Sequence, residues 1–167
     1  FDYNLPLEFL RQIFDAVNNQ PEDVWIIAHN GIFEIEAFLQ EFREILRIDV
    51  DTMLLSKLVY PSKYDDHSLK GLSEMLTGDE YLELKDIFKG KIRFNILPEN
   101  IVKWYACPDA TNPIKILKIL LKKLPEDERA LFFDVETRLP KVKAYNEFYG
   151  LKLDEQLLAD YVPKLEA

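Results

Sequence analysis

The chain of 167 residues lacks several features that would assign it to a particular class of protein. It has a single cysteine, Cys107, so no disulfide can form within it, and a reducing compartment is its natural setting. Its two histidines, His29 and His67, are not spaced like zinc ligands, and structural roles are expected for both. No apolar run approaches the ~20 residues that cross a bilayer, which argues against membrane insertion.

Basic residues are in the minority. The 21 lysines and arginines are outnumbered by 30 aspartates and glutamates, which gives a formal net charge of −9. This balance argues against binding of nucleic acid through a broad basic surface. It does not exclude a metal-dependent nuclease, because the site of such an enzyme itself concentrates carboxylates.

The stretch from Val24 to Phe38 predicts a strand, a turn and a helix. An uninterrupted apolar run from Val24 to Ala28 leads into His29-Asn30-Gly31. The apolar residues then recur at helical spacing: Ile35, Phe38, Leu39, Phe42, Ile45 and Leu46. A strand that is apolar at every position is buried on both faces, which favours a parallel sheet covered by helices. Since open α/β sheets bind ligands at the carboxyl ends of their strands, Asn30 and Glu34 are expected at a ligand site.

The first half of the chain contains further capping and spacing signals on either side of this stretch. They predict a helix from Pro6 to Asn18, a short strand at Ile48–Val50, a helix from Asp51 to Tyr60, a helix over 68–76 closed by Gly78, and a short helix over 81–88.

Prolines divide the second half into predicted helices. A helix follows Pro98, and Pro108 is expected to interrupt it, because proline lacks an N–H and clashes with the carbonyl of Trp104. A strongly apolar helix follows Pro113. The pattern then predicts a long helix over 131–148 kinked by Pro140, and a last helix capped by Asp154 that Pro163 should bend or end early.

Four stretches, in the right order, resemble the proofreading 3′–5′ exonuclease domain of family A DNA polymerases, the bacterial and phage polymerase I type. Ala28–Glu34 resembles the second exonuclease motif, an Asn followed by an aromatic residue and then an acid. Asp51–Leu55 with His67–Leu72 resembles the helix pair that comes next, and Tyr105–Ala110 resembles the third motif, a Tyr four residues before an Asp. Glu136–Pro140 with Asn146–Asp154 resembles the start of the polymerase thumb.

This resemblance implies an α/β fold of the ribonuclease H-like type, with three layers in which a mixed sheet carries helices on both faces. It implies that residues 1–124 form an exonuclease domain and residues 125–167 the helical start of the thumb. The family's first motif, an Asp-x-Glu on an early strand, has no counterpart before Asn30. The chain is therefore expected to be an excerpt whose first strands lie upstream of Phe1.

The chemistry that the resemblance implies is hydrolysis of a 3′-terminal nucleotide by a two-metal site holding Mg²⁺ or Mn²⁺. Glu34 and Asp109 would be metal ligands, the remaining ligands would lie upstream of Phe1, and Tyr105 would orient the attacking water. Asn30 and Phe33 would shape the pocket around the terminal nucleotide. The implied partners are a single-stranded or frayed DNA 3′ end and the polymerase domain of the same polypeptide, in the cytoplasm or at the nucleoid.

Plainer interpretations of these residues stay open. Glu34 can be a solvated acid and Tyr105 a core aromatic, while Asp109 and Asp51 can be simple helix caps. Aspartate is usual in the second motif, and two-metal geometry is strict, since a misplacement of ~1 Å can cost ~100-fold in rate. A catalytically vestigial domain that supports the polymerase is therefore the alternative, and a free-standing RNA-trimming nuclease of the same superfamily is a third possibility.

Overall fold

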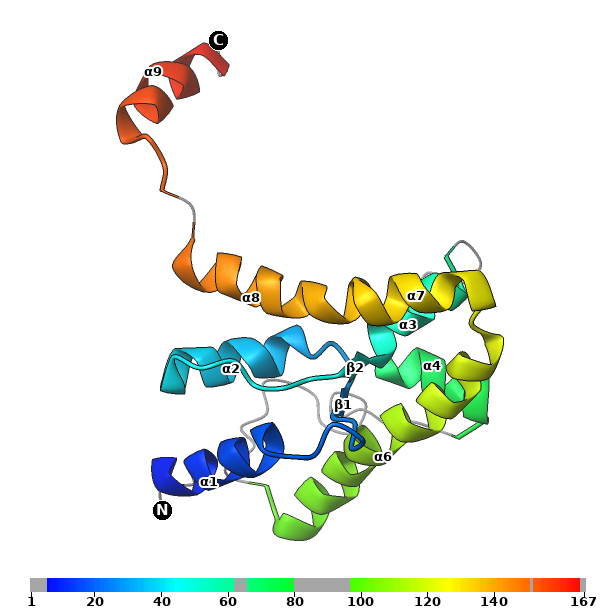
Figure 1. Cartoon of the computed structure of the whole chain (residues 1–167). Helices are drawn as coiled ribbons and strands as arrows, with labels where there is room; N and C mark the ends of the chain where they lie inside the picture. The colour runs from blue at the N-terminus through cyan, green and yellow to red at the C-terminus, as the bar shows by residue number, and fades with distance from the viewer. Residues whose placement is uncertain (1–5, 62–65, 80–96, 151, 166–167) are drawn as a thin grey trace.

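The computed structural model describes residues 6–61, 66–79, 97–150 and 152–165, and this part of the chain is mostly helical (Figure 1). Two short strands, β1 (Ile27–Ala28) and β2 (Val50–Asp51), pair in parallel, with Ile27 opposite Val50 and Ala28 opposite Asp51. A parallel pairing agrees with the predicted class of sheet. The described residues thus form an α/β arrangement in which helices predominate.

Strand β1 is shorter than the apolar run that predicted it, and β2 forms at Val50–Asp51 where the alternating segment Ile48–Val50 predicted a strand. The prediction that the run from Val24 is buried at every position is wrong, because Val24 and Trp25 are 40% and 46% exposed. Before β1, the carbonyl of Ile26 still accepts the N–H groups of Asp49 and Val50. Further back, side chains rather than a neighbouring strand hold the backbone, so the ladder does not extend over Val24 and Trp25.

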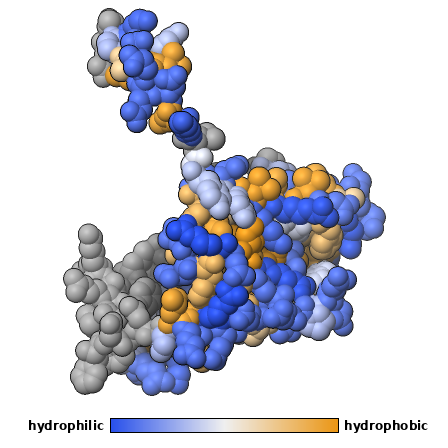
Figure 2. All heavy atoms as spheres, turned by 60° about the vertical axis from the view of Figure 1, so that its left-hand side comes forward, coloured by the Kyte–Doolittle hydropathy of each residue, from blue (hydrophilic) through white to orange (hydrophobic). Residues whose placement is uncertain are grey.

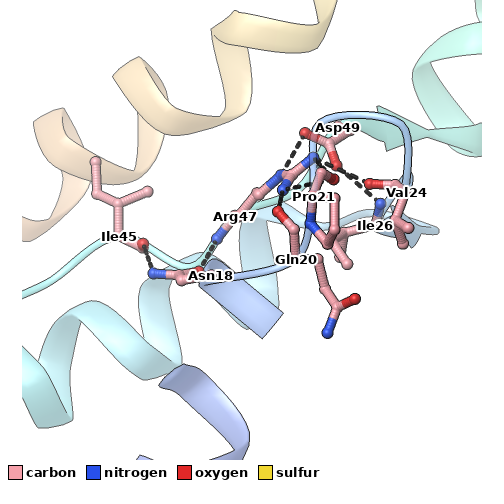
Figure 3. A network of polar contacts seen from close by, with 8 residues as sticks. All are labelled: Asn18, Gln20, Pro21, Val24, Ile26, Ile45, Arg47 and Asp49. Atoms are coloured by element: carbon pink, nitrogen blue, oxygen red, sulfur yellow. Dashed lines mark hydrogen bonds and ion pairs between the residues drawn. The ribbon is translucent and has the colours of Figure 1, made fainter. Parts of the chain in front are cut away.

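Those side chains form a polar network at the amino end of the sheet (Figure 3). The guanidinium of Arg47 donates to the carbonyls of Gln20, Pro21 and Val24 and to the carboxylate of Asp49. Asp49 in turn accepts the N–H of Ile26 at 2.8 Å. Asn18 completes the network by bridging Ile45 and Arg47, as an amide donor to the carbonyl of the first and an acceptor from the N–H of the second.

The helices of the first half lie close to their predicted positions: α1 (Leu7–Asn18), α2 (Ile32–Phe42), α3 (Thr52–Val59) and α4 (Leu69–Thr77). Asp51 and Ser68 cap α3 and α4 by accepting backbone N–H groups, and Gly78, at φ 72°, ends α4. The helical pattern predicted to continue to Leu46 stops at Phe42, because Arg43 takes a left-handed conformation with φ 58°. The helix predicted over 81–88 falls outside the described residues.

Helix α6 (Glu99–Lys123) corrects the predicted break at Pro108, since it runs unbroken through both Pro108 and Pro113. Each proline removes one backbone hydrogen bond from the helix interior. The buried face of α6, which includes Asn112, Ile116 and Leu120, packs against α3 and α4, and this tertiary packing offsets the local loss. As a consequence, Tyr105 and Asp109 lie one turn apart on a continuous helix and share a face.

The C-terminal helices are α7 (Glu126–Asp134), α8 (Leu139–Tyr149) and α9 (Glu155–Leu165). The kink predicted at Pro140 is misplaced: the helix breaks at Val135, with φ −120° and ψ −64°, and Pro140 sits in the first turn of α8, where a missing N–H costs little. Asp154 caps α9 as predicted, accepting the N–H of Leu157 at 3.0 Å. Helix α9 continues past Pro163 to Leu165.

Two apolar clusters hold these elements together. The first joins β2, α3, α4, α6 and α7 through Val50, Leu55, Leu72, Ile116, Leu117, Leu120, Leu124 and Phe132. The second joins α1, α2, α8 and the segment before β2 through Phe14, Ile35, Leu46, Ile48 and Ala144. Helix α8 lies along α2, whereas α9 stands apart from the other helices (Figure 1). None of the helices in the described ranges is long and apolar enough to cross a membrane.

Candidate active site

A cavity of about 680 Å³ runs along β1 and is bounded by the starts of α2, α3 and α4 and by the middle of α6. Four of the five residues predicted for the site line it: Asn30, Glu34, Tyr105 and Asp109. The fifth, Phe33, lies outside the wall of the cavity, on the first turn of α2, where its ring is 70% exposed. The fold therefore brings the second and third motifs of the sequence to one cavity.

The turn that carries Asn30 is held in an unusual conformation. Asn30 has a φ of 63°, a left-handed conformation that asparagine tolerates better than most residues. At Gly31, an added Cβ would lie 2.6 Å from Cδ1 of Ile48 and 3.0 Å from Cβ of Ala28, so a side chain does not fit. Gly31 is the N-cap of α2, so the helix begins at Ile32 and Glu34 lies in its first turn.

The two carboxyl groups in the cavity are partly desolvated. Burial raises the pKa of Asp109 above its ordinary value. Burial also raises the pKa of Glu34, and the nearby Asp51 carboxylate adds to this effect, while a backbone hydrogen bond at the start of α2 opposes it. No ion pair to Glu34 or Asp109 is formed within the described part of the chain. Both groups would be stabilised in their charged form by a cation bound between them.

The donor chemistry of the cavity fits a hard divalent cation, although the set of ligands is incomplete. Carboxylate oxygens are the ligands that Mg²⁺ prefers, usually one or two of them together with water. The described residues contain no group of three or more His, Cys, Asp or Glu side chains that could hold a metal ion. Glu34 and Asp109 would thus hold part of a metal site, and the other protein ligands of a two-metal site must come from outside the described residues.

Several residues that sequence reasoning did not assign to the site also line the cavity. Lys70, on α4, adds a basic residue to the lining of the cavity. Its signal in the sequence was its place inside the motif His67–Leu72. His29 lines the cavity as well, and its Nδ1 lies 2.9 Å from Oγ1 of Thr52. Burial lowers the pKa of His29, which favours the neutral imidazole.

His67 contacts the fold in a similar way, with its Nδ1 2.8 Å from Oγ of Ser56. Ser56 and Thr52 are four residues apart on α3, so the two histidines contact successive turns of the same helix. These contacts agree with the structural roles expected for His29 and His67. They also show that α3 is held against both the first strand and the segment that leads into α4.

Comparison with known families identifies the chain. A family model described as a 3′–5′ exonuclease matches residues 5–125, well over half of the sequence. No curated protein and no solved structure gave a match. The matched residues include β1, the Asn30 turn, α2 and the part of α6 that carries Tyr105 and Asp109, so the match covers the whole cavity. The chain belongs to the 3′–5′ exonuclease domain family of family A DNA polymerases.

Proposed function

We propose that the chain is the proofreading 3′–5′ exonuclease domain of a DNA polymerase I-like protein, and that it removes 3′-terminal nucleotides by two-metal hydrolysis. The observation that carries this proposal is the single cavity lined by Asn30, Glu34, Tyr105 and Asp109. Its proposed architecture is the three-layer ribonuclease H-like fold, for which the parallel pair β1–β2 would be one part of a larger mixed sheet.

In this function, the two acids and the tyrosine have separate tasks. Glu34 and Asp109 would hold Mg²⁺ or Mn²⁺, which when bound supplies an activated water and a counter-charge for the leaving oxygen. Both carboxyls must be ionised to do so; burial raises the pKa of each, and a bound cation would favour the charged form. The Tyr105 hydroxyl would orient the attacking water by a hydrogen bond, and its position one helical turn from Asp109 supports this role.

Asn30 and Phe33 would hold the terminal nucleotide. The Asn30 amide offers both donors and an acceptor at the cavity wall, which suits the polar edges of a nucleotide. The exposed ring of Phe33 offers a stacking face, and base stacking on aromatic side chains does not depend strongly on the base. Such a site suits a single-stranded or frayed 3′ end, whose last base is free to leave the stack.

The proposed domain division places the exonuclease at residues 1–124 and the start of the polymerase thumb at 125–167. Helix α9 supports a neighbouring domain, because its apolar side chains Leu157, Leu158 and Leu165 are 55%, 51% and 83% exposed. Figure 2 shows hydrophobic atoms, in orange, on the surface of this helix, which stands apart from the rest of the chain. A polymerase domain in the same polypeptide would also supply basic contacts to DNA that a chain of net charge −9 lacks. The proposed location, cytoplasmic or nucleoid-associated, follows from this role.

The alternative is a vestigial exonuclease domain that supports the polymerase without cutting DNA. It is favoured by glutamate at position 34, where aspartate is usual. It is also favoured because the described residues contain no group of three or more potential metal ligands. The continuous helix α6 favours catalysis instead, because it keeps Tyr105 and Asp109 on one face in spite of Pro108.

A nuclease assay decides between the two functions. The native polypeptide is incubated with end-labelled DNA that carries one mispaired 3′ nucleotide, in the presence of Mg²⁺ or Mn²⁺. We expect stepwise release of the 3′ nucleotide that stops on addition of EDTA and in the variants Glu34→Gln and Asp109→Asn. Glu36→Gln is the matched control, because Glu36 lies on the same helix as Glu34 but faces α8. Absence of release with either metal would leave the supporting role.

A further inference from the structure

The carboxylate of Asp51 receives hydrogen bonds from two different segments. Asp51 is 4% exposed at the end of β2, and its side chain accepts the N–H groups of Met53 at 2.8 Å and Leu54 at 3.4 Å. It also accepts the N–H groups of Asn30 at 3.1 Å and Gly31 at 2.8 Å, from the turn that follows β1. The first two bonds cap α3, and the other two connect the ends of the two strands.

Capping alone does not require the second pair of bonds. Ser68 caps α4 with one hydrogen bond, from the N–H of Gly71. At Asp51, the additional bonds hold a turn whose central residue, Asn30, is left-handed, a conformation that is unfavourable for residues with a Cβ. Bonds from N–H groups to an ionised carboxylate are among the stronger ones, so they are suited to hold this turn.

The neighbouring residue extends the same connection. The hydroxyl of Thr52 is 3.1 Å from the carbonyl of Ala28 and accordingly donates to it, and it also contacts the His29 ring. Asp51 and Thr52 together therefore hold four consecutive residues, from Ala28 to Gly31. The segment they hold leads from β1 into the helix that carries Phe33 and Glu34.

We infer that Asp51 is a positioning residue for the exonuclease site. Its carboxylate fixes the backbone at Asn30 and Gly31, and so it sets the place of the Asn30 amide and of the first turn of α2. Its effect on catalysis rests on the proposed function, whereas its hold on the turn does not. Asp51 is not a wall residue of the 680 Å³ cavity, and both of its oxygens are engaged by the backbone, so it acts through Asn30 and Glu34.

Two substitutions distinguish the role of Asp51 at the Asn30 turn from its role as the cap of α3. Asp51→Ser keeps an acceptor for the start of α3, since serine is a good cap, but its side chain is too short to reach the N–H of Gly31. Asp51→Asn keeps the length, removes the charge and turns an NH₂ group toward one of the four donors. The matched control is Asp49→Asn, in the segment before β2, whose carboxylate binds the N–H of Ile26 and Nε of Arg47.

The first measurement is amide hydrogen exchange by NMR on the full chain. We expect exchange at Asn30 and Gly31 to be at least about tenfold faster in Asp51→Ser and unchanged in Asp49→Asn. The second measurement is steady-state hydrolysis of mispaired primer ends. We expect kcat/KM to fall at least about tenfold in Asp51→Ser and by less in Asp51→Asn. Asp49→Asn should lower the Tm and leave kcat/KM unchanged.

The two readouts distinguish the inference from the proposed function. Unchanged exchange at Asn30 and Gly31 in Asp51→Ser overturns the inference, and so does faster exchange with native kcat/KM. If the native polypeptide releases no nucleotide, the proposed nuclease function fails. The inference is then tested by amide exchange together with the affinity for a fluorescent single-stranded oligonucleotide. If Asp51 positions Asn30, that affinity must be weaker in Asp51→Ser.

Discussion

The two ends of the small parallel sheet use polar residues in opposite ways. At the amino end, Arg47 and Asp49 satisfy each other and the surrounding backbone (Figure 3). At the carboxyl end, Glu34 and Asp109 face a cavity, and burial raises the pKa of both. The sheet thus has a closed polar network at its amino end, and at its other end a cavity to which α2 and α6 each bring one carboxyl without a cationic partner among the described residues.

The two ends are therefore expected to have different roles, one in the stability of the fold and the other in its chemistry. Groups that satisfy one another contribute to the free energy of unfolding, and their removal leaves buried backbone polar groups unpaired. Groups held apart in a cavity contribute little to folding and are available to a ligand. Substitutions at the amino end should therefore lower stability with little effect on catalysis, and substitutions at the carboxyl end should do the opposite.

The largest effect is expected at the two cavity acids. Glu34→Gln and Asp109→Asn should each lower the rate of nucleotide release by about 100-fold or more, because a metal ligand is lost. Both carboxyls have a pKa above the unfolded value, so the folded state binds their protons more tightly. Their contribution to stability therefore falls as the pH rises above the ordinary values of 3.8 for Asp and 4.5 for Glu.

At neutral pH without metal, the amide variants should accordingly be at least as stable as the native chain. Thermal unfolding in EDTA measures this, alongside the rate with Mg²⁺. A clear fall in Tm in EDTA would show that these acids support the fold, and it would contradict the contrast between the two ends.

Arg47→Ala should give the second largest effect, on stability rather than rate. It leaves the carbonyls of Gln20, Pro21 and Val24 without their donor, and it also removes the Nε–H group that donates to the carboxylate of Asp49. The expected loss is about 2 kcal/mol in the free energy of unfolding by urea, with kcat/KM nearly native below the transition. Lys103→Ala, which breaks an exposed pair with Glu99, is the control and should change little.

The parts of the fold that the sequence predicts well are those set by neighbouring residues. Helices α3 and α4 were predicted to within a residue or two because Asp51, Ser68 and Gly78 act on their own helices. Helix α6 was predicted as two pieces, because the proline rule is local and the packing of Ile116 and Leu120 that overrides it is not. The extent of β1 was overestimated at Val24 and Trp25, since an apolar run does not reveal what its partner is.

The same division applies to the candidate site. The short motifs identified Asn30, Glu34, Tyr105 and Asp109 as candidates, and the structure brings them to one cavity. The role of Asp51 at the turn was missed, because its bonds to Asn30 and Gly31 depend on the register of β1 and β2. A cap is visible in a sequence, whereas a contact between two strand ends requires the pairing to be known.

A smaller effect is expected at Phe33, and it tests substrate binding at the carboxyl end of the sheet. Phe33→Ala removes a ring that is 70% exposed, so Tm should change very little. Loss of the stacking face should raise KM for mispaired ends about tenfold and leave kcat nearly native. Steady-state kinetics measures the split, and a fall in kcat at native KM would show that Phe33 affects the acids instead.

The smallest effect is expected at Glu36, which lies on the same helix as Glu34 but faces α8. A hydrogen bond shared with Glu147 raises the pKa of Glu36, and the same bond lowers the pKa of Glu147. The pair is most stable with one proton between the two carboxyls, so the contact between α2 and α8 should weaken as the pH rises through the raised pKa of Glu36 and the two charges repel.

Glu36→Gln keeps a donor toward Glu147 at every pH, so this part of the pH dependence should disappear while nuclease activity is retained. Tm measured between about pH 4 and about pH 8 tests it. The native Tm should fall more than that of the variant as the pH rises above the ordinary value of 4.5 for Glu. Parallel curves would contradict the shared proton. In that case nothing would distinguish Glu36, held by a neighbouring acid, from Glu34, which lines the cavity.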